Sequence, residues 1–466
     1  MGLASSSIAF ALLATATVSA WDHLAARPIL APGYDLSKME NVRPSSDVVL
    51  GYDVGFGSDP GASVTVAIHV NRPAVLLEAV GVVRDVDCTS DGVTVSFSNK
   101  DTFLHAMLHW PQDAGLYLIT NHASNCDTGS DRGAHYVSGL SWDLGSMTVR
   151  AQTERRDLKE IASTLRILIS QEDNNAPKPD QDVTINLPQI NAASNFSIPG
   201  EMVIFSSPPN FTASVNGGRL SNTIAIQGHL EYDVEKQKLV TAWFNMDASL
   251  FIDLGLTFRF KGAQKSCGVV FYPGSFSPSR IYIPGILNLQ PTLHWSIGAD
   301  IGSDGPLAHQ DNLTANIGNG HVHLDFVNDN ETKFTGWTPD FSTSYSTEGV
   351  GTAHFSPSID FTAELAVNVM EGTYSSTGGF TTNSQLLNQI SPAAKREQQQ
   401  GIQKLRRTWR IRKGQQNMHL PRNSTCHGGY ELTSSFNLSL VAYVVDEWEE
   451  TQYSINFPIA DQCYYP

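Results

Sequence analysis

Two short segments of the chain each carry three side chains that can bind a metal ion or transfer a proton. In GNGHVHLDF, His321, His323 and Asp325 alternate with apolar residues. Alternate residues of a strand point to the same face, and imidazoles with a carboxylate can hold zinc, copper or manganese. The polar face of any half-buried strand shows the same alternation, which is the simpler interpretation. We keep His321, His323 and Asp325 as a weak candidate metal site. Because the polar strand face is the simpler interpretation, we expect the protein to bind no cofactor.

The segment GHLEYDVEK repeats this pattern with His229, Glu231 and Asp233. A second copy makes an ordinary polar strand face the better explanation of both segments. His105 and His109 are four residues apart, a spacing that aligns side chains on a helix and not on a strand. No Glu follows His105 directly, so this segment lacks the zinc-protease motif.

Acidic residues surround a tryptophan near the C-terminus. Asp446, Glu447, Glu449 and Glu450 flank Trp448 in VVDEWEE. Glycoside hydrolysis needs two carboxylates about 5–10 Å apart, and a tryptophan ring can stack on a sugar. Charges that protect a strand edge from unwanted pairing are the simpler explanation. We predict no catalytic residue in the chain.

The elements that must position these residues are mostly strands. Period-two alternation is clearest from Leu250 to Phe260, which a turn near 235–238 would pair with the preceding strand. Alternation or short apolar runs predict further strands at 63–70, 79–83, 93–97, 116–119, 280–283, 292–299, 321–326, 362–369 and 436–445. A helix is predicted at 156–163 alone. The expected fold is all-β and mainly antiparallel, with two β-sandwich-like domains and little helix.

Tryptophans fall mostly within these strand patterns, so we expect them to pack in the core. They are Trp21, Trp110, Trp142, Trp243, Trp295 and Trp337.

The expected domains follow from the composition along the chain. Residues 1–20 form a signal peptide, with Val18 and Ala20 before the cleavage site, and 21–171 form an N-terminal β domain. The Pro-containing stretch 172–182 is a linker, and 183–466 form a C-terminal β domain. Cleavage after Ala20 predicts a secreted, extracellular protein. No stretch has the ~18 apolar residues of a membrane span.

Cysteines and sequons agree with an oxidising compartment. Sequence proximity favours the disulfides Cys88–Cys126 and Cys426–Cys463, which leaves Cys267 over, although the five cysteines allow other pairings. Six sequons predict glycosylation at Asn195, Asn210, Asn312, Asn330, Asn423 and Asn437.

A basic tract at 391–422 interrupts the C-terminal domain. Nine of the 30 Lys and Arg residues lie in 395–422, with Glu397 the one acid there. A disordered loop is the favoured interpretation, and a basic amphipathic helix, proteolysis of a precursor at dibasic pairs or a wrongly translated segment are the others. The whole chain has 46 acids and a net charge of −16, so we expect no nucleic-acid binding.

The chain as a whole resembles a known kind of protein. Trp110, Cys126, Arg132 and Tyr136, together with IYIPGILNLQPTLHWSIGADI at 281–301, are similar to secreted fungal proteins made of two adjacent domains of unknown function. The resemblance covers most of 45–385, and the basic tract departs from it. The resemblance implies a fungal, extracellular, β-rich protein, and it identifies no catalytic residues in this chain.

These observations predict a secreted or cell-wall-associated protein that has a binding or structural role and no catalytic activity. Its partner would be a cell-wall polysaccharide or another extracellular protein, bound through a sheet face. The alternative is a secreted carbohydrate-active or metal-dependent enzyme that uses the residues around His321 or the cluster at 446–450. A concave pocket that gathers these residues with a tryptophan would favour the enzyme, and flat faces would favour binding.

Overall fold

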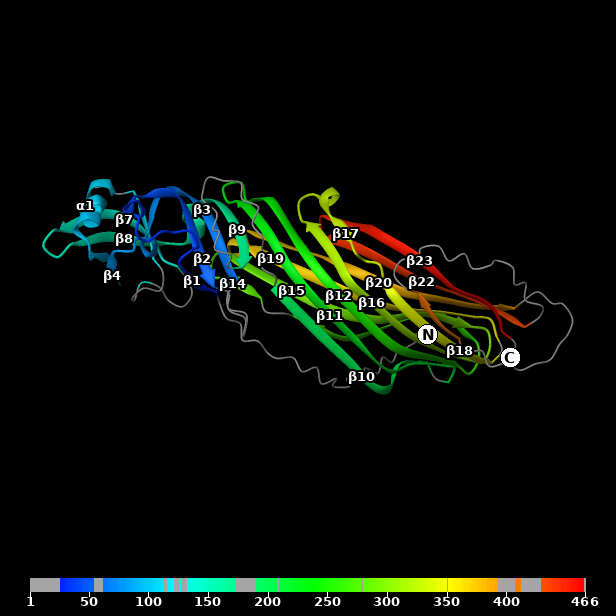
Figure 1. Cartoon of the computed structure of the whole chain (residues 1–466). Coiled ribbons are helices and arrows are strands. Elements are labelled where there is room, and N and C mark those ends of the chain that lie inside the picture. The colour runs from blue at the N-terminus through cyan, green and yellow to red at the C-terminus, as the bar shows by residue number, and fades with distance from the viewer. Residues whose placement is uncertain are drawn as a thin grey trace, which may run out of the picture.

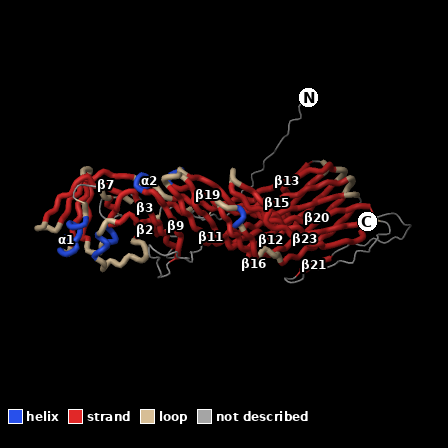
Figure 2. The backbone as a smooth tube through the Cα atoms, turned by 90° about the horizontal axis from the view of Figure 1, so that it is seen from above, coloured by secondary structure: helices blue, strands red, loops and turns tan. Residues whose placement is uncertain are grey.

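The computed structural model describes residues 26–53, 62–111, 115–120, 126, 132–171, 190–207, 209–277, 280–349, 351–392, 407–411 and 429–464. Over these residues the strands form a 16-stranded sheet, here the large sheet, and a 7-stranded sheet, here the small sheet. The molecule is elongated, and most of its length is made of long strands that run along it (Figures 1 and 2). The expected all-β, mainly antiparallel fold class is confirmed.

The N-terminal part consists of short strands with a few helical turns. Its strands are β1 (Arg27–Ile29), β2 (Ser45–Asp53), β3 (Ala62–Leu76), β4 (Val83–Thr89), β5 (Gly92–Phe97), β6 (Tyr117–Ile119), β7 (Ala134–Asp143), β8 (Thr148–Arg156) and β9 (Ala162–Gln171). Its helices are α1 (Lys100–His109) and α2 (Leu158–Ile161), with 3-10 turns η1 (Met39–Val42) and η2 (Leu77–Ala79).

Three local features differ from the predictions. Helix α1 was not predicted, and it begins after Asn99, whose side chain accepts from the backbone N–H of Asp101 and Thr102. Residues 79–83 form the end of η2 and a turn instead of a strand, and the helix expected at 156–163 is limited to α2.

A buried ion pair holds the N-terminal part together. Arg132 Nη1 lies 2.7 Å from Glu78 Oε1, and both side chains are almost fully buried. Arg132 Nη2 also donates to the carbonyl oxygens of Ile29 and Gly51, at 2.9 and 2.8 Å. One guanidinium therefore ties the loop before β7 to β1 and β2.

The C-terminal part is a sandwich of long strands. The large sheet continues through β10 (Ile190–Ser207), β11 (Phe211–Asp233), β12 (Lys238–Phe260), β16 (Leu307–Asp325), β17 (Lys333–Thr335), β18 (Asp340–Gly349) and β21 (Arg407–Ile411). The small sheet contains β13 (Gln264–Phe276), β14 (Ile281–Ile283), β15 (Leu287–Ser303), β19 (Ala353–Val369), β20 (Tyr374–Pro392), β22 (Tyr430–Val444) and β23 (Trp448–Tyr464). The turns η3 (Asp329–Glu331) and η4 (Met370–Gly372) follow β16 and β19.

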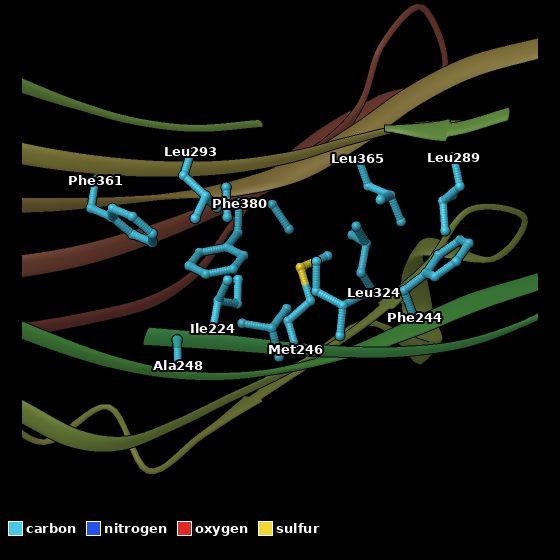
Figure 3. Close-up of a cluster of buried hydrophobic side chains, with 14 of the residues drawn as sticks. Ile224, Phe244, Met246, Ala248, Leu289, Leu293, Leu324, Phe361, Leu365 and Phe380 are labelled. Carbon is cyan, nitrogen blue, oxygen red and sulfur yellow. The ribbon is translucent and has the colours of Figure 1, made fainter. Parts of the chain in front are cut away.

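The core lies between the two sheets because alternate residues of each long strand face inward. Figure 3 shows this cluster, in which Phe244 and Met246 of β12 face the small sheet's Leu365 and Phe380. All four side chains are at most 2% exposed. The same alternation turns the intervening residues of β12 toward solvent.

Strand β9 joins the two parts of the chain. It pairs with β3 along Ala62–Val70 and with β11 from His229 to Asp233, so one sheet passes through both parts. Lys159 Nζ adds an ion pair to Glu371 Oε2 at 2.5 Å. The linker expected at 172–182 lies outside the described residues.

Of the basic tract, Ser391 and Pro392 end β20, and Arg407–Ile411 form β21, which pairs with β18. A strand at this place was not predicted. The remainder of the tract, like the signal peptide with Ala20, lies outside the described residues. None of the described helices has the length and hydropathy that crossing a membrane requires.

A buried polar network crosses the core between the sheets. His309 Nε2 donates to Asp311 Oδ1 at 3.0 Å, and its Nδ1 lies 2.8 Å from Thr347 Oγ1. From the small sheet, Asn388 Nδ2 donates to Asp311 Oδ2 at 3.1 Å, and Ser434 donates to Asn388. The side chains of His309 and Asp311 are 0% and 1% exposed. Such a network favours one register of strands whose apolar pattern tolerates several.

We expect Asp311→Leu to lower the free energy of unfolding by about 3–5 kcal/mol, because it leaves buried His309 and Asn388 without their partner. The matched control is Asp253→Leu on the solvent side of β12, where Asp253 is exposed and where we expect a change within about 0.5 kcal/mol. Denaturant unfolding followed by circular dichroism measures both. Equal losses in the two variants would show that the network contributes nothing specific.

Candidate functional site

The two polar segments singled out in the sequence meet on the outer face of the large sheet. Strand β12 lies between β11 and β16, and Trp243 is opposite both His229 of β11 and Asp325 of β16. Two residues further along β12, Asn245 is opposite His323 of β16, and two residues beyond that Asp247 is opposite His321. The strand between the two histidine segments therefore completes the site.

We call this surface the Trp243 face. It consists of His229, Trp243, Asn245, Asp247, His321 and His323, all partly exposed.

Three rings form the centre of the Trp243 face. The ring centroids of His229 and Trp243 are 5.8 Å apart with planes inclined by 26°, and those of Trp243 and His323 are 5.6 Å apart at 34°. Neighbouring rings on adjacent strands form a continuous row that presents aromatic surface and polar nitrogen atoms together. Such amphipathic rings suit ligands that have both an apolar face and hydroxyl groups.

Hydrogen bonds set the orientation of two imidazoles. His321 Nδ1 lies 2.7 Å from Asp247 Oδ1, and His323 Nδ1 lies 2.7 Å from Asn245 Oδ1. Since carboxylate and amide oxygens only accept, each Nδ1 carries the proton and donates. In the neutral form each Nε2 is therefore an acceptor for a ligand hydroxyl.

The imidazoles on either side of Trp243 are biased toward the neutral form. Burial lowers the pKa of His229, with a smaller effect from Arg166 in the same direction and an opposing one from Glu231. Burial also lowers the pKa of His323, against the attraction of Asp325. Both rings are thus mainly uncharged at neutral pH.

Charged groups around the face are paired with each other. Arg166 Nη2 lies 3.2 Å from Glu231 Oε1, and Lys333 Nζ lies 3.0 Å from Glu331 Oε2. Lys236 Nζ is 2.7 Å from Asp233 Oδ2 in the turn between β11 and β12. Within the part of the chain that the structure describes, these pairs leave Asp247 and Asp325 as carboxylates without a Lys or Arg partner, so the surface does not favour an anionic ligand.

The candidate metal ligands have other partners. His321 and His323 bond to Asp247 and Asn245, while Asp325 Oδ1 accepts from the backbone N–H of Val327 and Asn328, each at 2.8 Å. Among the described residues, no group of three or more His, Cys, Asp or Glu side chains is placed to hold a metal ion. His321, His323 and Asp325 share one face as predicted but do not converge on one point.

The acidic cluster near the C-terminus forms a turn. Val444 pairs with Trp448, so Asp446 and Glu447 lie in the connection between β22 and β23. Trp448 packs against the hydrophobic core and its indole nitrogen is buried. Trp448 is partly exposed, with one side of its ring system held against the core.

The buried array Thr347–His309–Asp311 has the group types of a hydroxyl–imidazole–carboxylate catalytic triad. It was not singled out in the sequence because its members are polar residues within apolar strands. His309 stacks on Phe355, with ring centroids 4.1 Å apart, inside the core. Since the side chains of His309 and Asp311 are buried, a substrate has no access, and the array is structural.

Sequence reasoning assigned Trp243 to the wrong environment, whereas Trp142 is partly exposed but packs against the N-terminal core and Trp21 lies outside the described residues. Trp243 was expected in the core, as Trp110, Trp295 and Trp337 are, but it lies on the outer face and is partly exposed. Extending the alternation of 250–260 back along β12 gives the outward positions 243, 245 and 247. That signal was present in the sequence.

Disulfides and sequons are placed as follows. Cys88 and Cys126 are bonded, the pairing that proximity predicted, and Cys267 is a free, partly buried thiol. Cys463 is disulfide-bonded, and Cys426 lies outside the described residues. Of the sequon asparagines, the following are exposed: Asn195, Asn210, Asn312 and Asn330.

The last two sequons differ from these. Asn437 is partly exposed on the outer face of the small sheet, and Asn423 lies outside the described residues.

We expect His229 and His323 to titrate below the usual imidazole pKa of 6.5, and Arg166→Gln to raise the pKa of His229 by removing a nearby positive charge. The pKa values of these histidines are lower in the folded protein than in the unfolded chain. Their contribution to the free energy of unfolding is therefore fully present above the unfolded pKa of about 6.5 and is lost as the pH falls from there through the folded pKa values. NMR titration of the imidazole protons measures this. The control Arg259→Gln, at a distant ion pair with Glu201, should change neither pKa. A His229 pKa that falls in Arg166→Gln would contradict this electrostatic account.

Comparison with known proteins concerns the N-terminal part. A family model described as Domain of unknown function (DUF7029) matches residues 67–166. These residues extend from within β3 into β9 and include α1 and the Cys88–Cys126 disulfide. No curated protein and no solved structure matches the chain. Residues 67–166 are therefore similar to a domain of unknown function, and Trp243 and its neighbours lie outside the matched segment.

Proposed function

We propose that this chain is a secreted, non-catalytic protein that binds a neutral extracellular polysaccharide through the Trp243 face. The observation that carries the proposal is the row of three rings on the outer side of the large sheet, flanked by hydrogen-bonding groups and paired charges. A pyranose ring has an apolar face for stacking and hydroxyl groups for the imidazole and amide acceptors. A fungal cell wall is the setting that the sequence resemblance suggests.

Extracellular placement is supported by three features of the chain. The first twenty residues have the pattern of a signal peptide, a disulfide joins Cys88 to Cys126, and several sequon asparagines are exposed. Passage through the secretory pathway would account for all three features.

The Trp243 face is a better candidate surface than the middle of the small sheet's outer face. Asn437 lies on the outer face of the small sheet in the row Gln385–Asn437–Asn456, so a glycan there would stand in the middle of that face. No sequon falls on the residues of the Trp243 face. A polymer on the Trp243 face itself therefore meets no glycan attached to that face, and the nearest sequon along β12 is Asn195, in the row of Ser221 and Phe251.

We expect Trp243→Ala to weaken retention on insoluble polysaccharide at least about tenfold, which corresponds to ~1.4 kcal/mol. The measurement is a depletion isotherm of the secreted full-length protein on cellulose, chitin and β-1,3-glucan. The matched control is Tyr272→Ala, which removes an aromatic side chain that is 69% exposed on β13 of the small sheet.

Two results would contradict the proposal. One is binding by Trp243→Ala equal to that of the unaltered chain, and the other is equal loss in the two variants. Release of soluble sugar from any of the polymers would instead favour the carbohydrate-active enzyme.

A further inference from the structure

A second ring lies on the outer face of the same strand. Phe251 of β12 points to the same side as Trp243 and is partly exposed. The two residues are eight positions apart, which in an extended antiparallel strand corresponds to about 27 Å. One sugar unit cannot reach both rings, but a linear chain can.

The surroundings of Phe251 are those of a binding position and not of a core side chain. The guanidinium carbon of Arg219 lies 6.0 Å from the centre of its ring. Ser221 of β11 and Asn316 of β16 are directly opposite Phe251 and supply a hydroxyl and an amide. Phe251 thus has a ring flanked by hydrogen-bonding groups on both sides, as Trp243 has.

The surface between the two rings carries short side chains. Ser249 is opposite Thr223, and their hydroxyl oxygens are 2.5 Å apart. Asp247 is opposite Ala225 on one side and bonds His321 on the other. No large side chain of β12 stands between Trp243 and Phe251, since the outward positions are Asn245, Asp247 and Ser249.

Charge determines the class of polymer. Asp247 accepts a hydrogen bond from His321, and Arg219 Nε donates to Asn195 Oδ1 at 3.0 Å while its guanidinium lies near the Phe251 ring. Beyond Phe251, Asp253 Oδ1 accepts from the Thr314 hydroxyl at 3.2 Å. The strip along β12 therefore presents hydrogen-bonding groups without a run of one charge, which fits an uncharged polymer.

We propose that a single linear, neutral polysaccharide chain lies along β12 and contacts Trp243 and Phe251 at the same time. This inference rests on the proposed function and adds the direction and the length of the ligand. Two contacts joined by one ligand act as linked sites, so affinity rises steeply once the chain is long enough to span both.

The test is affinity against chain length. Calorimetry with cello-, chito- and laminari-oligosaccharides of increasing length is carried out on the full-length protein after removal of N-glycans, because sequon Asn195 bonds to Arg219. For the unaltered chain we expect a gain of at least about tenfold when the oligomer reaches about 27 Å, the distance that strand geometry gives.

Variants assign that gain to the two rings. Phe251→Ala should abolish the gain with length and leave the affinity for short oligomers unchanged, whereas Trp243→Ala should weaken short and long oligomers alike. Phe251→Tyr, which keeps the ring, should retain the gain, and this separates loss of the contact from a folding defect. The control Tyr272→Ala should bind as the unaltered chain does.

The outcomes separate this inference from the proposed function. Trp243-dependent binding with no gain over length, or a gain that persists in Phe251→Ala, would overturn the inference and leave the proposed function standing. Absence of binding to every oligomer and polymer would overturn both.

Discussion

Burial of one face of the long strands determines where every outer side chain of the large sheet stands. Phe244 and Met246 of β12 are in the core, so Trp243 and Asn245 must point outward. Strands β11 and β16 obey the same rule on either side, which places His229 and His323 next to Trp243. The candidate site is thus a direct consequence of how the core packs, and it needs no loop to hold it in place.

Alternation alone does not fix which residues become neighbours, because a slip of two residues keeps the same face buried. Two features remove this freedom. A bulge between Val215 and Gly218 shifts the pairing of β11 with β12, and a Cβ at Gly218 would lie 2.3 Å from the carbonyl oxygen of Asp253, so only glycine fits there. The buried network of His309, Asp311 and Asn388 joins the two sheets at one register. The bulge sets the register of β11 against β12, and the network fixes β16 relative to β18 and to the small sheet.

The fold class and many strands could be predicted because period two is a local signal, whereas the site depended on pairing that is not local. His229 and His323 are far apart in sequence, and only the register of β11, β12 and β16 shows that Trp243 lies between them. Trp243 was misassigned because its size suggested the core, although the alternation of its own strand points it outward. Helix α1 was missed because its apolar residues show little periodicity.

The central claim is that a polymer contacts the outer face of the large sheet at Trp243. Hydroxyl-radical footprinting of the full-length protein, read by mass spectrometry with and without saturating oligosaccharide, tests it directly because Trp243 is partly exposed. The account predicts reduced oxidation of Trp243 and unchanged oxidation of Tyr272, which is exposed on β13 of the small sheet. Unchanged oxidation of Trp243 under conditions where the oligosaccharide is bound, or protection at Tyr272 instead, would contradict the account.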